Sequence, residues 1–295
     1  MTECKTPGTG RRRRTSLGQK LRRAISDPRI VGRAVYRRAG LRRLALRTRG
    51  RWRTWYPHRR PRVASLMGRL RRERVVHVLH IRKTGGTALK DALATCPKPT
   101  GVRIVFHGHS VRLTDIPPRD EVVFFVRDPV TRFVSGFNGR LREGRPRYNV
   151  PLSARERRAL TRFPTPDDLA LGLYADDPST RHEAHAAMRE VRNVGTRLAD
   201  WLGDTGTLMA RRDTILLAGW TDTLSEDFQR LKALLGLSSE CRLPTGDSAH
   251  RAPETQTRTL SDSAVANLHR WFADDEPLLA ACRELAGRTH QPVAT

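Results

Sequence analysis

The chain has 295 residues, a hydrophobic content of 38% and a formal net charge of +26. This apolar content excludes a chain that is disordered throughout, and the length suits either one α/β domain of roughly 200 residues with an extension or two small domains. Residues 1–74 hold 25 basic and 3 acidic side chains, so residues 75–295 carry a net charge of only +4. The basicity therefore belongs to the N-terminal segment.

The cysteine spacing and the length of the apolar runs indicate the cellular compartment. The cysteines lack CxxC spacing, which disfavours a zinc site or a disulfide framework and favours reduced thiols in a cytosolic setting. No apolar run reaches the ~18–20 residues needed to span a bilayer. No apolar h-region follows Arg11–Arg14, so we expect neither a secretory nor a twin-arginine signal. These features predict a cytoplasmic protein; its cysteines are Cys4, Cys96, Cys241 and Cys282.

The first segment, residues 1–74, is an Arg-rich extension. Residues 1–24 are polar and of like charge, which is typical of disorder. Residues 27–50 place apolar side chains at loosely helical spacing with arginines between them, which predicts either a basic amphipathic helix peripheral to an anionic membrane or a solvated tail. Nucleic acid would also attract such a tail, but we do not expect it as the partner.

The globular part is predicted over residues 75–295, where strands alternate with helices. Four apolar runs predict strands: Val75–His80, Val102–Phe106, Glu121–Val126 and Thr214–Ala218. Helices are predicted over Thr87 to about Ala94, Pro129 to about Glu143, much of 153–212, Leu224–Leu235 and Ser261 to about Leu285. This alternation predicts a parallel sheet flanked by helices, a P-loop-like three-layer α/β/α fold.

A loop between the first strand and the first helix of this part has the composition of an anion cradle. Its two glycines, Gly85 and Gly86, let backbone N–H groups approach an oxyanion, and the following helix N-terminus adds positive charge. A lysine and two threonines, Lys83, Thr84 and Thr87, add a full charge and hydroxyl donors. The lysine precedes the glycines, so this is not a Walker A loop.

A second anion site is predicted after the third strand. Arg127 at the strand end presents a planar fork suited to phosphate. Asp128 and Pro129 predict a helix start there, as N-cap and first helical residue. Ser135 lies about two helical turns further on, and Arg132 falls on a different helix face, which favours a structural role.

The candidates for a catalytic base are the two histidines that follow the second predicted strand, His107 and His109. The unperturbed pKa of histidine, near 6.5, suits proton removal from a hydroxyl. A His-x-His pair also fits a metal site, but no third ligand is evident, so no metal is predicted. Asp91 and Asp115 remain alternative bases.

The segment HIRKTGGTAL resembles the 5′-phosphosulfate loop of the carbohydrate-type sulfotransferases, usually written His-Ile-Pro-Lys-Thr-Gly-Gly-Thr-Ser. It departs from that pattern at Arg82 and Ala88. The Arg-Asp-Pro…Arg…Ser string that starts at Arg127 is similar to the family's 3′-phosphate motif. This resemblance covers about residues 75–285 and includes heparan sulfate 2-O-sulfotransferase and bacterial sulfotransferase family 2 proteins.

The resemblance implies a donor, 3′-phosphoadenosine-5′-phosphosulfate (PAPS), and roles for particular residues. Residues Lys83 to Thr87 would bind its 5′-phosphosulfate, and Arg127 with Ser135 its 3′-phosphate. Arg251 is a further expected nucleotide contact. By similarity to the His-Gly-His of heparan sulfate 2-O-sulfotransferase, His109 is the expected base and His107 its assistant.

The expected reaction is sulfuryl transfer from PAPS to a hydroxyl of a carbohydrate or lipid-linked acceptor, with 3′-phosphoadenosine-5′-phosphate (PAP) as product. The first alternative is a P-loop-type nucleotide kinase or NTPase, which would require Mg²⁺. The second is a nucleic-acid-binding protein that acts through the Arg-rich tail.

Overall fold

The computed structural model describes residues 60–145, 148–245 and 259–288. All of them belong to one compact unit, Tyr56–Thr295. The amphipathic helix expected within residues 27–50 lies outside the described residues. Within the described ranges, no helix combines the length and apolar character needed to cross a membrane.

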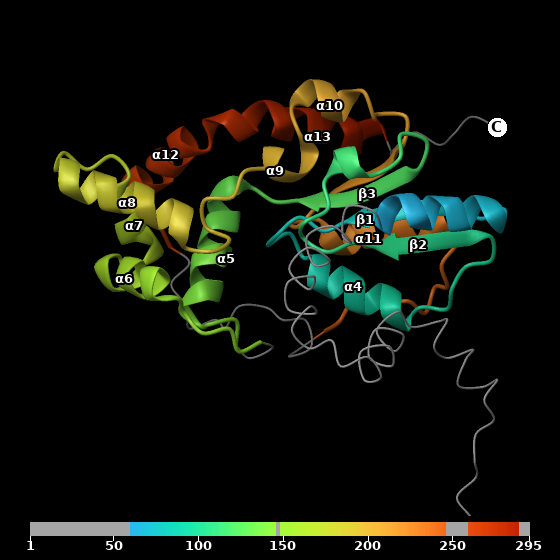
Figure 1. Ribbon diagram of the computed structural model, residues 1–295, viewed down its shortest axis with the longest axis horizontal. Helices are drawn as coiled ribbons and strands as arrows, with labels where there is room; N and C mark the ends of the chain where they lie inside the picture. Colours follow the sequence, from blue (N-terminus) through green and yellow to red (C-terminus); the bar gives the residue numbers. More distant parts are fainter. Residues whose placement is uncertain (1–59, 146–147, 246–258, 289–295) are drawn as a thin grey trace, which may run out of the picture. The chain divides into compact units, whose positions relative to one another are not determined.

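A four-stranded, all-parallel sheet forms the centre of this unit (Figure 1). The strand order is β2-β1-β3-β4, with β1 beside both β2 and β3. This confirms the predicted α/β fold, and each predicted strand is present: β1 (Arg74–Leu79), β2 (Val102–Phe106), β3 (Glu121–Val126) and β4 (Ile215–Trp220).

Helices cover both faces of the sheet, as buried parallel strands require. One face packs against α4 (Gly86–Thr95) and α11 (Leu224–Leu235) through a cluster that includes Val123 and Phe228. The opposite face packs against α9 (Ala199–Leu202), α10 (Thr205–Met209) and α13 (Glu276–Arg288). Figure 1 shows these two helical layers on either side of the strands.

A second group of helices packs around α5 (Pro129–Leu141) beyond the end of the sheet (Figure 1). It consists of α6 (Ala154–Arg162), α7 (Pro166–Gly172), α8 (Pro178–Glu190) and α12 (Asp262–Trp271), and its core includes Phe133 and Phe137. The chain after β1 also contains two short 3-10 turns, η1 (Leu113–Asp115) and η3 (Ala273–Asp275). The sequence predicted this region as mostly helical, and the structure confirms it.

A further helix covers residues 60–70, before the position where the sequence places the start of the globular part. Gly68 packs directly on Val75 of β1, and the Ser65 hydroxyl donates to a carboxylate oxygen of Asp120 at 3.1 Å. The basic segment therefore contributes a packed element to the domain.

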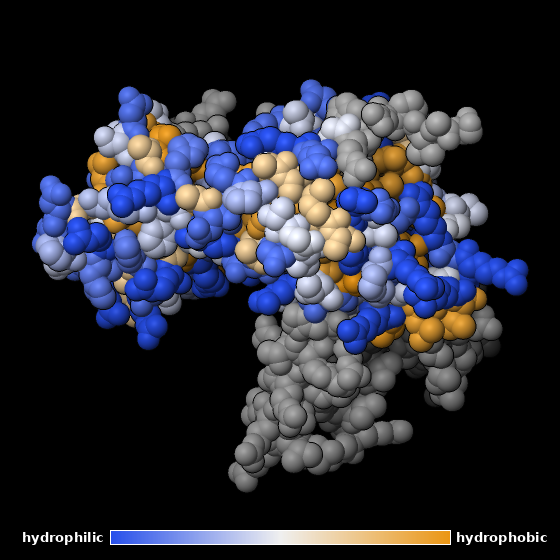
Figure 2. Space-filling model, turned by 90° about the horizontal axis from the view of Figure 1, so that it is seen from above, coloured by the Kyte–Doolittle hydropathy of each residue, from blue (hydrophilic) through white to orange (hydrophobic). Residues whose placement is uncertain are grey.

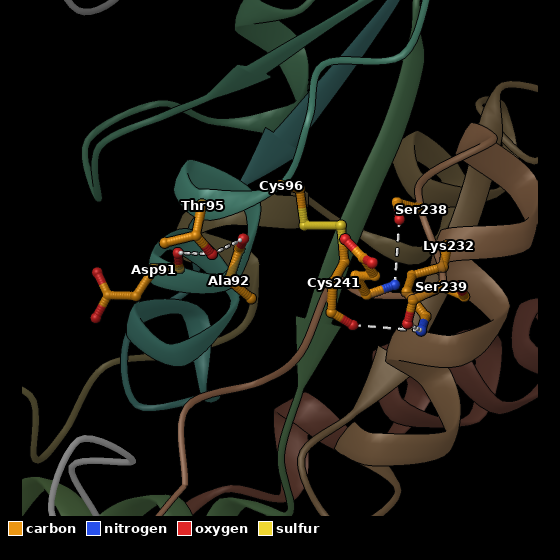
Figure 3. Close-up of a disulfide and its surroundings, with 9 residues drawn as sticks. Asp91, Ala92, Thr95, Cys96, Lys232, Ser238, Ser239 and Cys241 are labelled. Atoms are coloured by element: carbon orange, nitrogen blue, oxygen red, sulfur yellow. Dashed lines mark hydrogen bonds between the residues drawn. A yellow bond between two sulfur atoms is a disulfide. The ribbon is translucent and has the colours of Figure 1, made fainter.

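A disulfide joins Cys96, at the end of α4, to Cys241, in the segment after α11 (Figure 3). The expectation of reduced thiols is wrong for this pair. Lys232 of α11 supports the same segment, because its ammonium donates to the carbonyl oxygens of Ser239 and Cys241 at 3.2 and 3.3 Å. The two cysteines are 145 residues apart in the chain, so sequence spacing gave no signal of their proximity.

Candidate functional site

The predicted anion loops leave the sheet from neighbouring strands. The Lys83 loop follows β1, Arg127 follows β3, and these strands pair directly, with Leu79 opposite Phe124. The chain runs from β1 outward to β2 on one side and continues with β3 on the other. Ligands of open α/β sheets bind at such a switch point, beyond the carboxyl ends of the strands. The topology therefore places both loops at the same edge of the sheet, beyond the carboxyl ends of two neighbouring strands.

The loop after β1 opens a helix whose first N–H groups have no side-chain cap. Gly85 is the N-cap of α4, in the left-handed region at φ 77°, and it has no side chain to bond to the first turn. The first N–H groups of a helix lack intrahelical partners. By contrast, Asp128 caps α5 by accepting from the Thr131 N–H at 2.8 Å, as predicted. The α4 terminus is therefore available to an anion.

Lys83 extends from this loop to α5. A Cβ on Gly139 would lie 2.9 Å from the Lys83 ammonium nitrogen, so a side chain larger than hydrogen would displace the lysine. Burial, together with the charges of Arg142 and Arg127, lowers the pKa of Lys83 to about 8. Three cations thus share one region, and an anion placed there would relieve their repulsion.

One face of α5 connects these cations. Thr131, Ser135, Gly139 and Arg142 follow each other at spacings of four, four and three residues, which places them on one side of a helix. The Arg127 guanidinium donates to the Thr131 hydroxyl at 3.1 Å at the start of this face, and Lys83 meets it at Gly139. Thr131 and Gly139 are about 12 Å apart along the axis, with the half-buried Ser135 between them.

Arg142 is a member of this cluster that the sequence reasoning missed. Its Nη1 atom is buried without a hydrogen-bond partner among the described residues, while its Nε donates to the Arg145 carbonyl at 3.2 Å. Burial also lowers the pKa of its guanidinium. Its position seven residues after Ser135 is the helical spacing that could have identified it. A buried, unpartnered donor nitrogen beside Lys83 has the chemistry of an anion ligand.

His109 is held at the end of β2 by two hydrogen bonds. Its Nδ1 lies 3.1 Å from the backbone oxygen of His80, and its own carbonyl accepts from the indole N–H of the buried Trp201 at 2.8 Å. Because a carbonyl only accepts, Nδ1 carries the proton, and Nε2 of the neutral ring is the basic nitrogen.

Burial, together with the positive charge of the site, favours the neutral form of His109. Burial lowers its pKa below 6.5; the hydrogen bond to His80 opposes this, and the charges of Arg82, Lys83 and Lys90 add to the lowering. The His80 ring lies 3.9 Å from the His109 ring, centroid to centroid, and rests on Gly86. Burial lowers the pKa of His80 to about 3. His80 and Trp201 are site residues to which the sequence reasoning gave no role.

His107 lies apart from this pair in a buried chain of polar groups. Its Nε2 is 2.8 Å from Nδ1 of His77, whose Nε2 is 2.9 Å from the Asp120 carboxylate. Its Nδ1 is buried without a partner among the described residues. The ring contacts of His107 are therefore with His77, and none joins it to His109 or Lys83 in the described part of the chain.

The four remaining predicted residues have different surroundings. Thr84 is buried and its hydroxyl donates to the Ile81 carbonyl at 3.0 Å, so the expectation that it offers a hydroxyl donor to the anion is wrong. Thr87 is half-buried in the first turn of α4. Arg251 lies outside the described residues. Arg132 is buried against Asp275 at 3.2 Å, which is the structural role that was expected of it.

The two alternative bases sit on other elements. Asp91 belongs to α4, where its backbone oxygen accepts from the Thr95 hydroxyl at 3.4 Å (Figure 3). The Asp115 carboxylate accepts from the Arg112 N–H at 2.9 Å and caps its own 3-10 turn. Among the described residues, no group of three or more His, Cys, Asp or Glu side chains is arranged to hold a metal ion.

No protein-family model matches this chain, and no curated protein matches it either.

Proposed function

We propose that the chain is a sulfotransferase that moves the sulfuryl group of PAPS onto a hydroxyl of a carbohydrate or glycan-like acceptor. The observation that carries this proposal is the convergence of Lys83, Arg127 and Arg142 along one face of α5. Two separated cationic ends fit a nucleotide with two separated anionic groups. The sequence resemblance assigns the Lys83 end to the 5′-phosphosulfate and the Arg127 end to the 3′-phosphate.

The chemical fit rests on groups that need a negative partner. The first N–H groups of α4 have no side-chain cap, and the Arg142 Nη1 is buried without a partner among the described residues. These donors would be satisfied by phosphate and sulfate oxygens. Ser135 lies between the two ends and adds a hydroxyl. Arg251, which lies outside the described residues, remains a proposed contact to the nucleotide.

In the proposed reaction the acceptor oxygen attacks the sulfur of PAPS in line with the leaving group. The new O–S bond forms as the bond from sulfur to the bridging phosphate oxygen breaks, and PAP leaves. The acceptor proton passes to Nε2 of His109. Lys83 and the α4 N-terminus stabilise the charge that develops on the leaving oxygen, so that positioning and electrostatics supply most of the acceleration.

Location belongs to the proposal as well. The sequence favours the cytoplasm, whereas the Cys96–Cys241 disulfide is the kind of bond that oxidising compartments maintain. The redox state of these two cysteines in cells is therefore the measurement that separates the two settings.

A calorimetric titration of the full chain tests the donor assignment. We expect PAP to bind without Mg²⁺, and Lys83→Ala and Arg127→Ala each to weaken its affinity about 10–100-fold, the scale of a lost charge-assisted hydrogen bond. Arg212→Ala is the matched control, because Arg212 is exposed and pairs only loosely with Asp213 at 3.6 Å.

Two outcomes would contradict the proposal. Tighter binding of ATP with Mg²⁺ than of PAP would favour the nucleotide kinase or NTPase. Absence of nucleotide binding together with tight binding of duplex DNA would favour a nucleic-acid-binding protein that acts through its basic tail.

A further inference from the structure

The helix over residues 60–70 exposes its larger apolar side chains and buries small or polar ones. Its inward positions are the small or polar residues Pro61, Ser65 and Gly68, all of them buried. Its larger apolar side chains face outward at the helical spacing of three, one and three residues. Their exposed fractions are 57% for Val63, 58% for Leu66, 38% for Met67 and 71% for Leu70. We call these four residues the outer apolar stripe.

Arginines border the outer apolar stripe at both ends. Arg60, Arg62, Arg69, Arg71 and Arg72 are all exposed, and no ion pair joins any of them to a carboxylate of the described residues. Figure 2 shows apolar side chains bordered by hydrophilic ones on the side of the molecule where this helix lies. A short apolar stripe with cations on its flanks is the pattern of a helix that lies in the interface of an anionic bilayer.

We propose that the helix over residues 60–70 docks this protein on an anionic lipid surface. The outer apolar stripe would enter the boundary between headgroups and acyl chains, and the flanking arginines would bind lipid phosphates. This inference is independent of the proposed sulfotransferase activity, because it uses none of the residues of the candidate site.

Other occupants of the stripe fit the observations less well. Nucleic acid would use the arginines, but the helix offers only aliphatic side chains and no aromatic ring on which bases stack. The stripe spans eight residues, about 10 Å of helix, which is too small for the roughly 800 Å² per partner of a stable dimer. Residues 1–59 carry many arginines themselves, so like charge opposes their binding beside it.

Vesicle flotation of the full chain tests the proposal. The probes are phosphatidylcholine vesicles alone and vesicles with about one-third phosphatidylglycerol. The variant Leu66→Glu/Leu70→Glu removes the apolar term, and Arg62→Gln/Arg69→Gln removes charge. Leu171→Glu is the matched control, since Leu171 of α7 is 39% exposed but belongs to another helix.

Salt separates the apolar contribution from the Coulombic one. In about 1 M NaCl the screening length falls to about 3 Å, so the basic tail contributes little. There we expect the double-glutamate variant to lose about 10-fold or more in partitioning, and Leu171→Glu to match the parent. At low salt we expect the double-glutamine variant to bind the anionic vesicles a few-fold more weakly.

A second readout keeps the test independent of any effect on folding. In Leu70→Trp, brominated lipids should quench more fluorescence than in the parent, whereas Leu171→Trp should show no added quenching. Equal partitioning of the parent and the double-glutamate variant at high salt would overturn the proposal. So would a parent dimer that this variant converts to monomer, or a loss of duplex DNA binding in place of vesicle binding.

Discussion

The Nδ1 atom of His109 lies 3.1 Å from the backbone oxygen of His80, and this contact decides which ring nitrogen can accept a proton. The carbonyl of His80 forces the tautomer, so Nε2 is the basic atom. The same backbone position leads directly into the Lys83 loop. The candidate base and the candidate anion cradle are therefore positioned by one short stretch of chain at the end of β1.

His109→Ala should reduce turnover at least about 100-fold, the usual contribution of a positioned base. Its affinity for PAP should stay unchanged, because the anion ligands are elsewhere. Initial rates of sulfuryl transfer from labelled PAPS to a carbohydrate acceptor, with parallel calorimetry, measure both quantities. Normal turnover in this variant would assign proton removal to another group.

The pH profile gives a second check on the same residue. Since burial holds the pKa of His109 below 6.5, the neutral base predominates at pH 7. The rate should be level through neutrality and should fall as the pH drops through that lowered pKa. His109→Ala should lack this acidic limb, whereas His182→Gln, which alters an exposed histidine, should retain it.

Lys83 should make nucleotide affinity depend on pH. Its pKa is lowered to about 8, so in the unliganded protein it loses its charge as the pH rises through that value. Affinity for PAP should therefore decline between about pH 7 and pH 9, with net proton uptake on binding at the upper end. Lys83→Arg should remove the decline because arginine stays charged, and Lys98→Ala should leave it unchanged.

The buried chain of His107, His77 and Asp120 should make the fold sensitive to acid. Burial lowers the pKa of His107 to about 3 and also lowers that of His77, whereas both titrate near 6.5 when unfolded. Between these values the unfolded chain binds more protons, so the free energy of unfolding decreases as the pH falls below about 6.5. Denaturant unfolding at several pH values measures this slope.

A substitution of His107 separates the effect of histidine titration on stability from the effect of packing. His107→Leu should lower the free energy of unfolding at pH 7 by about 1–3 kcal/mol, because Nδ1 of His77 loses its partner. It should also flatten the decrease between pH 6.5 and 4. An unchanged slope in His107→Leu would show that other groups cause the acid sensitivity, and His182→Gln again serves as the control.

The disulfide predicts which cysteines are linked and how much their link contributes to the free energy of unfolding. Peptide mapping of alkylated, non-reduced protein should recover Cys96 joined to Cys241, with Cys282 as a free but buried thiol. Cys96→Ser/Cys241→Ser should lower the free energy of unfolding by about 2–5 kcal/mol, because the bond constrains the unfolded chain. Cys282→Ser, the control, should leave the mapped disulfide intact.

The alternation of apolar strands and amphipathic helices predicted the fold, because both periodicities are local properties of the chain. The N-cap of α5 was predicted for the same reason, since Asp128-Pro129 acts within one turn. Arg127 and the Lys83 loop were identified from composition at strand ends. Their convergence then follows from the strand order, which the alternation alone does not specify.

The features that sequence reasoning missed depend on contacts across the fold. The Cys96–Cys241 pair and the His107–His77–Asp120 chain join segments far apart in sequence. Thr84 was misjudged because its hydroxyl turns back to the Ile81 carbonyl, which only the loop conformation reveals. The helix over residues 60–70 escaped notice because its apolar residues face outward, so it resembled the rest of the basic segment.

The direction of that helix has a consequence for how substrates would arrive. Gly68 packs on Val75 at the beginning of β1, while the charge of Arg60 acts on His107 beyond the end of β2, so the helix runs antiparallel to the strands. If this helix lies flat on lipid, the strands run parallel to the membrane plane. The Lys83 and Arg127 loops at their carboxyl ends would then face sideways, toward molecules that diffuse within the headgroup layer.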